Sequence, residues 1–167
     1  AYEPSGAAAY VQRNVLGTGP MGGALNVSAD GDNLVLVSWV DNDVRIWDPV
    51  NKQRIWQKAG LAAPVAAVRF GSDIAVAEHG RQSVVGYDAN GDESSIYASG
   101  VEAPTGLLVD GDNLFVSDRA TGQIMQLAEA GKILQEPRVV ITGLTTPEGF
   151  VKHQSAFAVV EADLGQV

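Results

Sequence analysis

Three carboxylates recur at one position of a regularly spaced pattern in this sequence. Glu78, Asp118 and Glu161 each end a short apolar run, the steps between them are 40 and 43 residues, and Ser38 holds the same position one step earlier. Carboxylates gathered at one end of a fold can attract a cation or order water for acid–base chemistry. Alternatively, each carboxylate accepts hydrogen bonds from the adjoining loop, an arrangement that repetition alone would produce. We treat the three as candidates for a ligand-binding rim.

Two histidines are the remaining candidates for proton transfer. His79 follows Glu78 directly in "AEHG" and is the candidate catalytic base, whereas His153 in "KHQ" is expected in an exposed turn. Two histidines without cysteine do not make a zinc constellation. The string "GTGPMG" at 17–22 matches G-x-G-x-x-G, but Pro20 and a further strand follow where a pyrophosphate site needs a helix. No cofactor is therefore evident.

Composition excludes several functional classes. The chain has 167 residues, enough for one domain with a sizeable core, and 46% of them are hydrophobic against 19% charged. Its 11 basic and 20 acidic residues give a net charge of −9 without a basic cluster, which argues against a nucleic-acid partner. No apolar run approaches the roughly 20 residues of a membrane span. The compartment stays open, with a periplasmic or secreted location preferred to a cytoplasmic one.

An internal repeat organises the chain. The string "DGDNL" occurs at 30–34 and again at 110–114, and "FGSDI" at 70–74 is a diverged copy between them. The apolar runs that follow begin at Leu34, Ile74, Leu114 and Phe157, in steps of 40, 40 and 43 residues. Asp30-Gly31 and Asp110-Gly111 are dipeptides typical of hairpin turns.

Each repeat predicts four short strands. First strands are expected at 65–70, 105–109 and 148–151; second strands at 34–38, 74–78, 114–118 and 157–161; third strands at 44–48, 84–88 and 124–128; and fourth strands at 54–58, 95–98 and 138–142. In isolation "GQIMQLAEAGKIL" resembles a helix, but the repeat predicts a hairpin there. Four strands in about 40 residues are typical of a β-propeller blade. The sequence therefore predicts an all-β propeller of four-stranded antiparallel blades.

About four blades are expected in a single domain, 1–167. Their approximate bounds are 24–61, 62–101, 102–144, and 145–167 together with 1–17. We expect the chain to be part of a six-bladed propeller. The alternative is a closed four-bladed ring in which the segment 10–16 completes the last blade. An open arc would expose apolar blade faces, which a second chain or further residues would have to cover.

The repeat also resembles a known family. The stretch "SGVEAPTGLLVDGDNLFVSDRATGQIMQL" is similar to NHL-type and SMP-30/gluconolactonase-like repeats, which share a P-x-G motif followed by an apolar strand. The resemblance implies a six-bladed propeller in a superfamily that includes lactonases, lyases and interaction modules, and the fold does not decide among them. "VRIWD" at 44–48 also resembles the WD-repeat signature, but only one repeat has it.

The resemblance implies a position for metal ligands. In gluconolactonase-like relatives these ligands lie on the first strand of a blade, at the x of P-x-G, which corresponds here to Leu25, Val65, Thr105 and Glu148. Glu148, with Thr105 as a weaker donor, is thus the candidate ligand for a divalent metal such as Ca²⁺. A divalent cation needs several oxygen donors, so a single carboxylate cannot hold it.

Two functional hypotheses remain. The first is a ligand- or protein-binding propeller module without an evident catalytic constellation, whose partner is a protein or a small molecule. The alternative is a metal-dependent lactonase- or lyase-like hydrolase acting at the central channel. The first leads because three of the four channel positions lack a carboxylate, and whether the protein is an enzyme stays open. Trp39, Trp47 and Trp56 all lie in the first blade, as an aromatic platform or as packing between blades.

Overall fold

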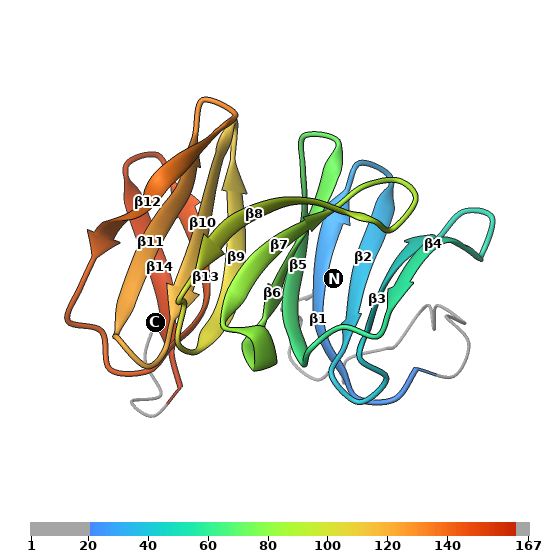
Figure 1. Ribbon diagram of the computed structural model, residues 1–167, viewed down its shortest axis with the longest axis horizontal. Helices are drawn as coiled ribbons and strands as arrows, with labels where there is room; N and C mark the ends of the chain where they lie inside the picture. Colours follow the sequence, from blue (N-terminus) through green and yellow to red (C-terminus); the bar gives the residue numbers. More distant parts are fainter. Residues whose placement is uncertain (1–20, 163–167) are drawn as a thin grey trace, which may run out of the picture.

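The computed structural model describes residues 21–162, which form fourteen β-strands and one short 3₁₀ helix (Figure 1). The strands are β1 Ala24–Asp30, β2 Asn33–Ser38, β3 Asp43–Asp48, β4 Gln53–Ala59, β5 Pro64–Phe70, β6 Asp73–Glu78, β7 Ser83–Tyr87, β8 Glu93–Ser99, β9 Pro104–Asp110, β10 Asn113–Asp118, β11 Gln123–Glu129, β12 Lys132–Ile141, β13 Pro147–His153 and β14 Ala156–Glu161. Helix η1 covers His79–Arg81. The segment at 10–16, which the alternative of a closed four-bladed ring requires as a strand, lies outside the described residues.

The strands form successive antiparallel sheets, which we call blades 1 to 4. Blades 1 to 3 have four strands each (β1–β4, β5–β8 and β9–β12), and blade 4 is the hairpin β13–β14. First strands lie side by side in the order β1, β5, β9, β13, and the blades fan out from them (Figure 1). The predicted four-stranded blades are confirmed, and "GQIMQLAEAGKIL" forms the β11–β12 hairpin rather than a helix.

The two ends of the blades differ in their connections. At one end, hairpin turns join the first strand to the second and the third to the fourth; we call this the hairpin end. At the other end, which we call the loop end, loops connect the second strand to the third and the last strand of each blade to the first strand of the next. Helix η1 lies at the loop end, at the bottom of Figure 1.

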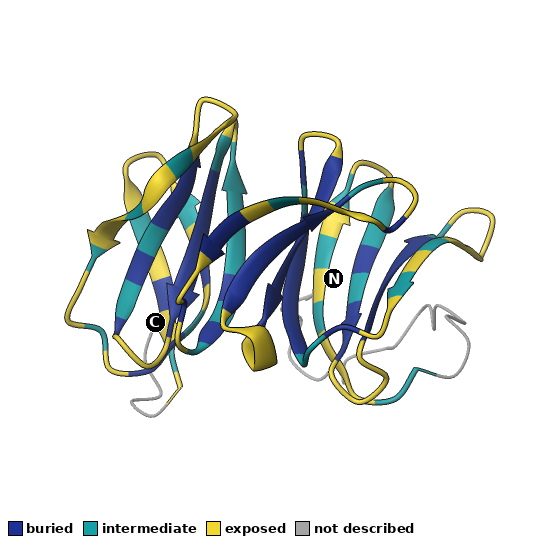
Figure 2. Ribbon diagram, in the orientation of Figure 1, coloured by how far each residue is buried: buried dark blue, intermediate teal, exposed yellow. Residues whose placement is uncertain are grey.

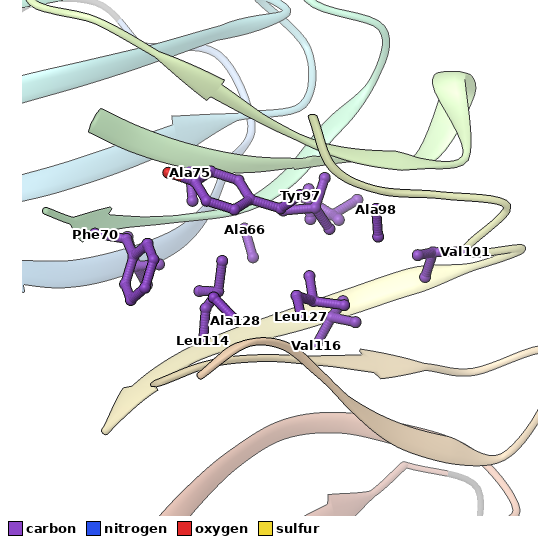
Figure 3. Packing of buried hydrophobic residues seen from close by; sticks show 14 residues of the cluster. Ala66, Phe70, Ala75, Tyr97, Ala98, Val101, Leu114, Val116, Leu127 and Ala128 are labelled. Carbon is purple, nitrogen blue, oxygen red and sulfur yellow. The ribbon is translucent and has the colours of Figure 1, made fainter. Parts of the chain in front are cut away.

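Successive blades bury their facing sides against each other. On β6, the second strand of blade 2, Ile74 and Val76 pack toward blade 1, while Ala75 and Ala77 pack toward blade 3. β6 is buried along its whole length (Figure 2), and Figure 3 shows the cluster between blades 2 and 3, which includes Ala75 and Leu114. Trp47 is buried and Trp56 packs against the cluster between blades 1 and 2. The outer faces of blades 1 and 4 are open by comparison, with Val27 61% and Val151 59% exposed.

The glycine of the P-x-G motif permits a close approach between blades. A Cβ atom on Gly106 would lie 2.8 Å from the carbonyl oxygen of Glu148 on β13, nearer than real Cβ atoms come. Ser117 Oγ donates a hydrogen bond of 2.7 Å to the same carbonyl. The motif thus has a structural cause here, which is the backbone-to-side-chain contact between blades 3 and 4.

The hairpin end carries a further set of contacts between blades. Asp30 accepts two hydrogen bonds of 3.0 Å from the Arg69 guanidinium, and Asp110 forms an ion pair with Lys152, so blade 1 is tied to blade 2 and blade 3 to blade 4. At the equivalent junction between blades 2 and 3, the two positions hold Phe70 and Val109, which belong to the apolar cluster there. Asp30 and Asp110, the first residues of the repeated string, therefore begin the hairpin turns and also form ion pairs with the following blade.

We predict that the bond between Asp30 and Arg69 contributes to stability as a coupled pair. In a double-mutant cycle of Asp30→Asn and Arg69→Gln, the coupling free energy should be about 1 kcal/mol, because the bidentate pair is only partly shielded from water. Urea unfolding of the four proteins measures it, and the coupling should fall in high salt. Asp32→Asn, in the exposed turn beside the pair, is the control and should change stability by less than about 0.5 kcal/mol. Additive effects of the two substitutions would contradict the prediction.

Candidate functional site

The three rim carboxylates share one structural arrangement at the loop end. Glu78 Oε2 accepts a 2.7 Å hydrogen bond from the amide of Ala62, and Asp118 accepts bonds of 3.1 and 3.0 Å from the amides of Glu102 and Ala103. Glu161 accepts a bond of 2.8 Å from the amide of Thr145 and a longer one from the next amide. In each case the partner lies 15 or 16 residues earlier, in the segment that enters the same blade. The carboxylates hold this entering segment to the end of the second strand.

Serine replaces the carboxylate at this position of blade 1, and its bond to the entering segment runs in the opposite direction. Ser38 Oγ donates to the carbonyl oxygen of Gly22, again 16 residues earlier, and accepts a 2.9 Å bond from the amide of Asp41. Side chains of Glu78 and Asp118 are almost fully buried, and that of Glu161 is half-buried. Ligand binding by these residues stays a prediction, and any ligand would have to compete with amide donors already in place.

Glu78 has a second partner that the other two carboxylates lack. Its Oε1 accepts a 2.6 Å hydrogen bond from the Tyr87 hydroxyl. Burial, and then the hydrogen bond to Glu78 and its charge, raise the pKa of Tyr87 well above its ordinary value. Tyr87 therefore stays a neutral donor to Glu78 at all physiological pH values.

The two candidate metal ligands lie at the contact between blades 3 and 4. Thr105 Oγ1 donates a 2.7 Å hydrogen bond to the carbonyl of Pro147 and lies 2.9 Å from Ser117 Oγ. Glu148 Oε1 forms an ion pair of 3.1 Å with Arg119. Within residues 21–162, no group of three or more acidic, histidine or cysteine side chains is close enough together to hold a metal ion. A metal at Glu148 would need ligands from elsewhere and would replace a guanidinium.

An exposed aromatic cluster lies at the loop end of blades 1 and 2. Trp39 and Val40, in the turn after β2, are 43% and 65% exposed. The Trp39 ring lies 6.0 Å from the ring of His79, which is exposed at the start of η1, and Arg81 follows two residues later with an ion pair to Glu93. His79 and Glu78 are adjacent in sequence but differ in exposure, because Glu78 points into the blade. We call Trp39, Val40 and His79 the aromatic cluster.

The sequence identifies His79 as a candidate site residue but does not predict that Trp39 lies beside it. The sequence groups the three tryptophans by blade, whereas the structure separates Trp39, which is exposed at the loop end, from Trp47, which is buried, and Trp56, which packs against the cluster between blades 1 and 2. The signal that distinguishes Trp39 is its place just after the rim position Ser38, where the second strand has already ended. His153 is exposed at the end of β13 on the opposite end of the blades.

Comparison with known proteins identifies the fold and no family. No known protein family and no curated protein matches this sequence. Solved structures do match: a chain of a nidogen–laminin complex has a TM-score of 0.71 at 17% identity, over 86% of this chain and 57% of that one. Virginiamycin B lyase from Staphylococcus aureus has a TM-score of 0.61 at 17% identity, and the match covers 81% of this chain and 47% of the lyase chain. The computationally designed protein Ika4 has a TM-score of 0.65 at 13% identity, and the match covers 87% of this chain and 89% of the Ika4 chain.

The blades and these neighbours together define a β-propeller. The chain spans about half the length of the two natural proteins above. At these identities the similarity concerns the fold alone. In the part of the chain that the structure describes, no helix is long and apolar enough to cross a membrane.

We predict that Glu78→Gln lowers the pKa of Tyr87. The substitution removes the negative charge that opposes ionisation of the phenol, so the pKa should fall toward its ordinary value of about 10. Because the pKa of Tyr87 is higher in the folded than in the unfolded protein, its contribution to the free energy of unfolding is complete below about pH 10. That contribution is lost as the pH rises further.

Absorbance of tyrosinate at alkaline pH measures the effect, with Tyr87→Phe subtracted to isolate the one residue. Asp118→Asn is the matched control, since Leu127 replaces the tyrosine at the equivalent position of blade 3. An unchanged Tyr87 titration in Glu78→Gln would show that Glu78 does not control its ionisation.

Proposed function

We propose that this protein is a binding propeller module that recognises a protein ligand through the loop end. The aromatic cluster is the observation that carries the proposal. Tryptophan is enriched among the residues that dominate binding energy, and Trp39 and Val40 are consecutive apolar residues that are both exposed. The carboxylates nearby are engaged in holding the loops, which gives the cluster a fixed backbone. Protein binding also agrees with the acidic, non-nucleic-acid character of the chain.

Peptide selection tests the proposal and requires no candidate partner. Peptides selected from a random library on the immobilised protein should bind in solution, and Trp39→Ala should weaken their binding at least tenfold, because a buried interface tryptophan typically contributes about 2 kcal/mol. Val50→Ala is the control, since Val50 is 79% exposed at the hairpin end of the same blade. Failure to select binders, or equal losses in both variants, would contradict the proposal.

The lactonase- or lyase-like alternative depends on Glu148. Its support is the resemblance of the P-x-G segments, with Glu148 at the position of a metal ligand. Metal analysis and calorimetric titration with Ca²⁺ distinguish the two functions. We expect no stoichiometric metal in the purified protein, because Arg119 already neutralises Glu148. Stoichiometric Ca²⁺ that is lost in Glu148→Ala, together with lactone hydrolysis, would establish the alternative instead.

We further propose that the blades belong to an NHL-type, gluconolactonase-like ring of six blades. The P-x-G segments support this assignment, as do the open outer faces with Val27 and Val151. Such faces would be covered by further blades or by a second chain. The molar mass of the protein in solution tests this assembly: a monodisperse monomer of 167 residues would contradict coverage by a second chain.

A further inference from the structure

A cavity lies between blades 2 and 3 at the hairpin end. Its volume is about 240 Å³, and both blades contribute to its walls. The residues that matter for the argument are Phe70, Asp73, Tyr97, Val109, Asp112 and Ile133. The cavity occupies the junction at which Phe70 and Val109 replace the charged pair. It is at the opposite end of the blades from the aromatic cluster, and the inference is independent of the function proposed above.

A buried carboxylate lines this cavity. Asp73 is only 8% exposed, and its Oδ2 accepts hydrogen bonds from Ser94 Oγ at 2.5 Å and the Tyr97 hydroxyl at 3.3 Å. Its Oδ1 accepts a bond of 3.1 Å from Ser72 Oγ. Burial, and then the charge of Asp73, raise the pKa of Tyr97 to about 12, so this tyrosine remains a neutral donor. Among the described residues, Asp73 therefore has three hydroxyl partners and no ion pair.

The surrounding residues are fitted to this carboxylate. A Cβ atom on Gly86 would lie 2.8 Å from Asp73 Oδ2, so the carboxylate occupies space that only glycine leaves open. The equivalent positions in blades 1 and 3 hold Ile46 and Gln126 in place of glycine. Asn33 and Asn113 replace the aspartate in the same two blades. At this repeat position of the described blades, a carboxylate is thus found only in blade 2, whose junction with blade 3 has no ion pair equivalent to those of Arg69 and Lys152.

We propose that this cavity binds a primary alkylammonium group, which supplies the positive charge that Arg69 and Lys152 supply at the other two junctions. The ammonium would pair with Asp73, and the exposed carboxylate of Asp112 adds negative potential at the opening. Phe70 and Tyr97, whose rings meet edge to face at 5.6 Å, provide aromatic surface for the cation. Val109 and Ile133 provide apolar wall for the alkyl chain. A divalent metal fits less well, because Ca²⁺ takes about six to eight oxygen ligands and, among the described residues, no group of three or more acidic, histidine or cysteine side chains could hold a metal ion.

Calorimetric titration with n-butylammonium chloride at constant ionic strength tests the proposal. Binding should be at least tenfold weaker in Asp73→Asn, and neutral n-butanol should not bind to the wild-type protein. The amide resonances of Gly111 and Gly131, which line the cavity, should shift on titration. Asp32→Asn removes a charge from the equivalent exposed turn of blade 1 and should leave binding unchanged. Equal binding by Asp73→Asn, or displacement of the amine by stoichiometric Ca²⁺, would overturn the proposal.

A second variant keeps the test valid if Asp73→Asn does not fold. Val109→Lys places an ammonium at the position that Lys152 occupies in blade 4, so it should block butylammonium binding and raise the melting temperature. Unchanged binding by Val109→Lys would overturn the proposal as well. Nα-acetyl-lysine methylamide, titrated in parallel, distinguishes the source of the ligand: tighter binding than butylammonium indicates a partner's lysine side chain, and weaker binding indicates a free amine.

Discussion

Face-to-face packing of successive sheets is the constraint on which this structure depends. Each blade is only four strands wide and must bury both of its faces, so it cannot be stable without neighbours. This requirement explains why β6 is buried along its whole length and why alternate residues, such as Val76 and Ala77, pack against different blades. Small and β-branched residues dominate because two sheets must approach closely along the first strands. The same constraint restricts where function can lie, since solvent reaches the two ends of the blades, the open outer faces and the fourth strands, whereas β6 is buried throughout.

Repetition makes the fold predictable from the sequence. The steps of about 40 residues place the strands within a few residues of their observed bounds, because turn dipeptides such as Asp30-Gly31 mark where the first strand ends. Local pattern alone would misassign "GQIMQLAEAGKIL", and the equivalence of blades corrects it. β12 is longer than expected, since the additional residues of the third repeat extend both strands of that hairpin.

The candidate site is less predictable, because side-chain direction decides it. Glu78 and His79 are adjacent, yet one is buried against an amide and a tyrosine while the other is exposed beside Trp39. The repeat pattern of the sequence does not distinguish a carboxylate that is hydrogen-bonded to a loop from one that is free to bind a ligand. The ion pairs between blades also escape prediction, although a signal is present: Arg69 and Lys152 occupy one repeat position, and aspartate precedes them in the neighbouring blade.

Those ion pairs divide the blades into two kinds. Blades 1 and 3 present an aspartate to the blade that follows, and blades 2 and 4 receive it with a basic residue, whereas the two equivalent positions between blades 2 and 3 hold Phe70 and Val109. The unit of this architecture is therefore a pair of blades. An ion pair connects the two blades of a pair, and Phe70 and Val109 occupy the equivalent positions between one pair and the next. A ring assembled from such pairs has compatible junctions all the way round only when its number of blades is even. An odd ring would have to set an aspartate against an apolar residue, or leave a basic residue unmatched, at one junction.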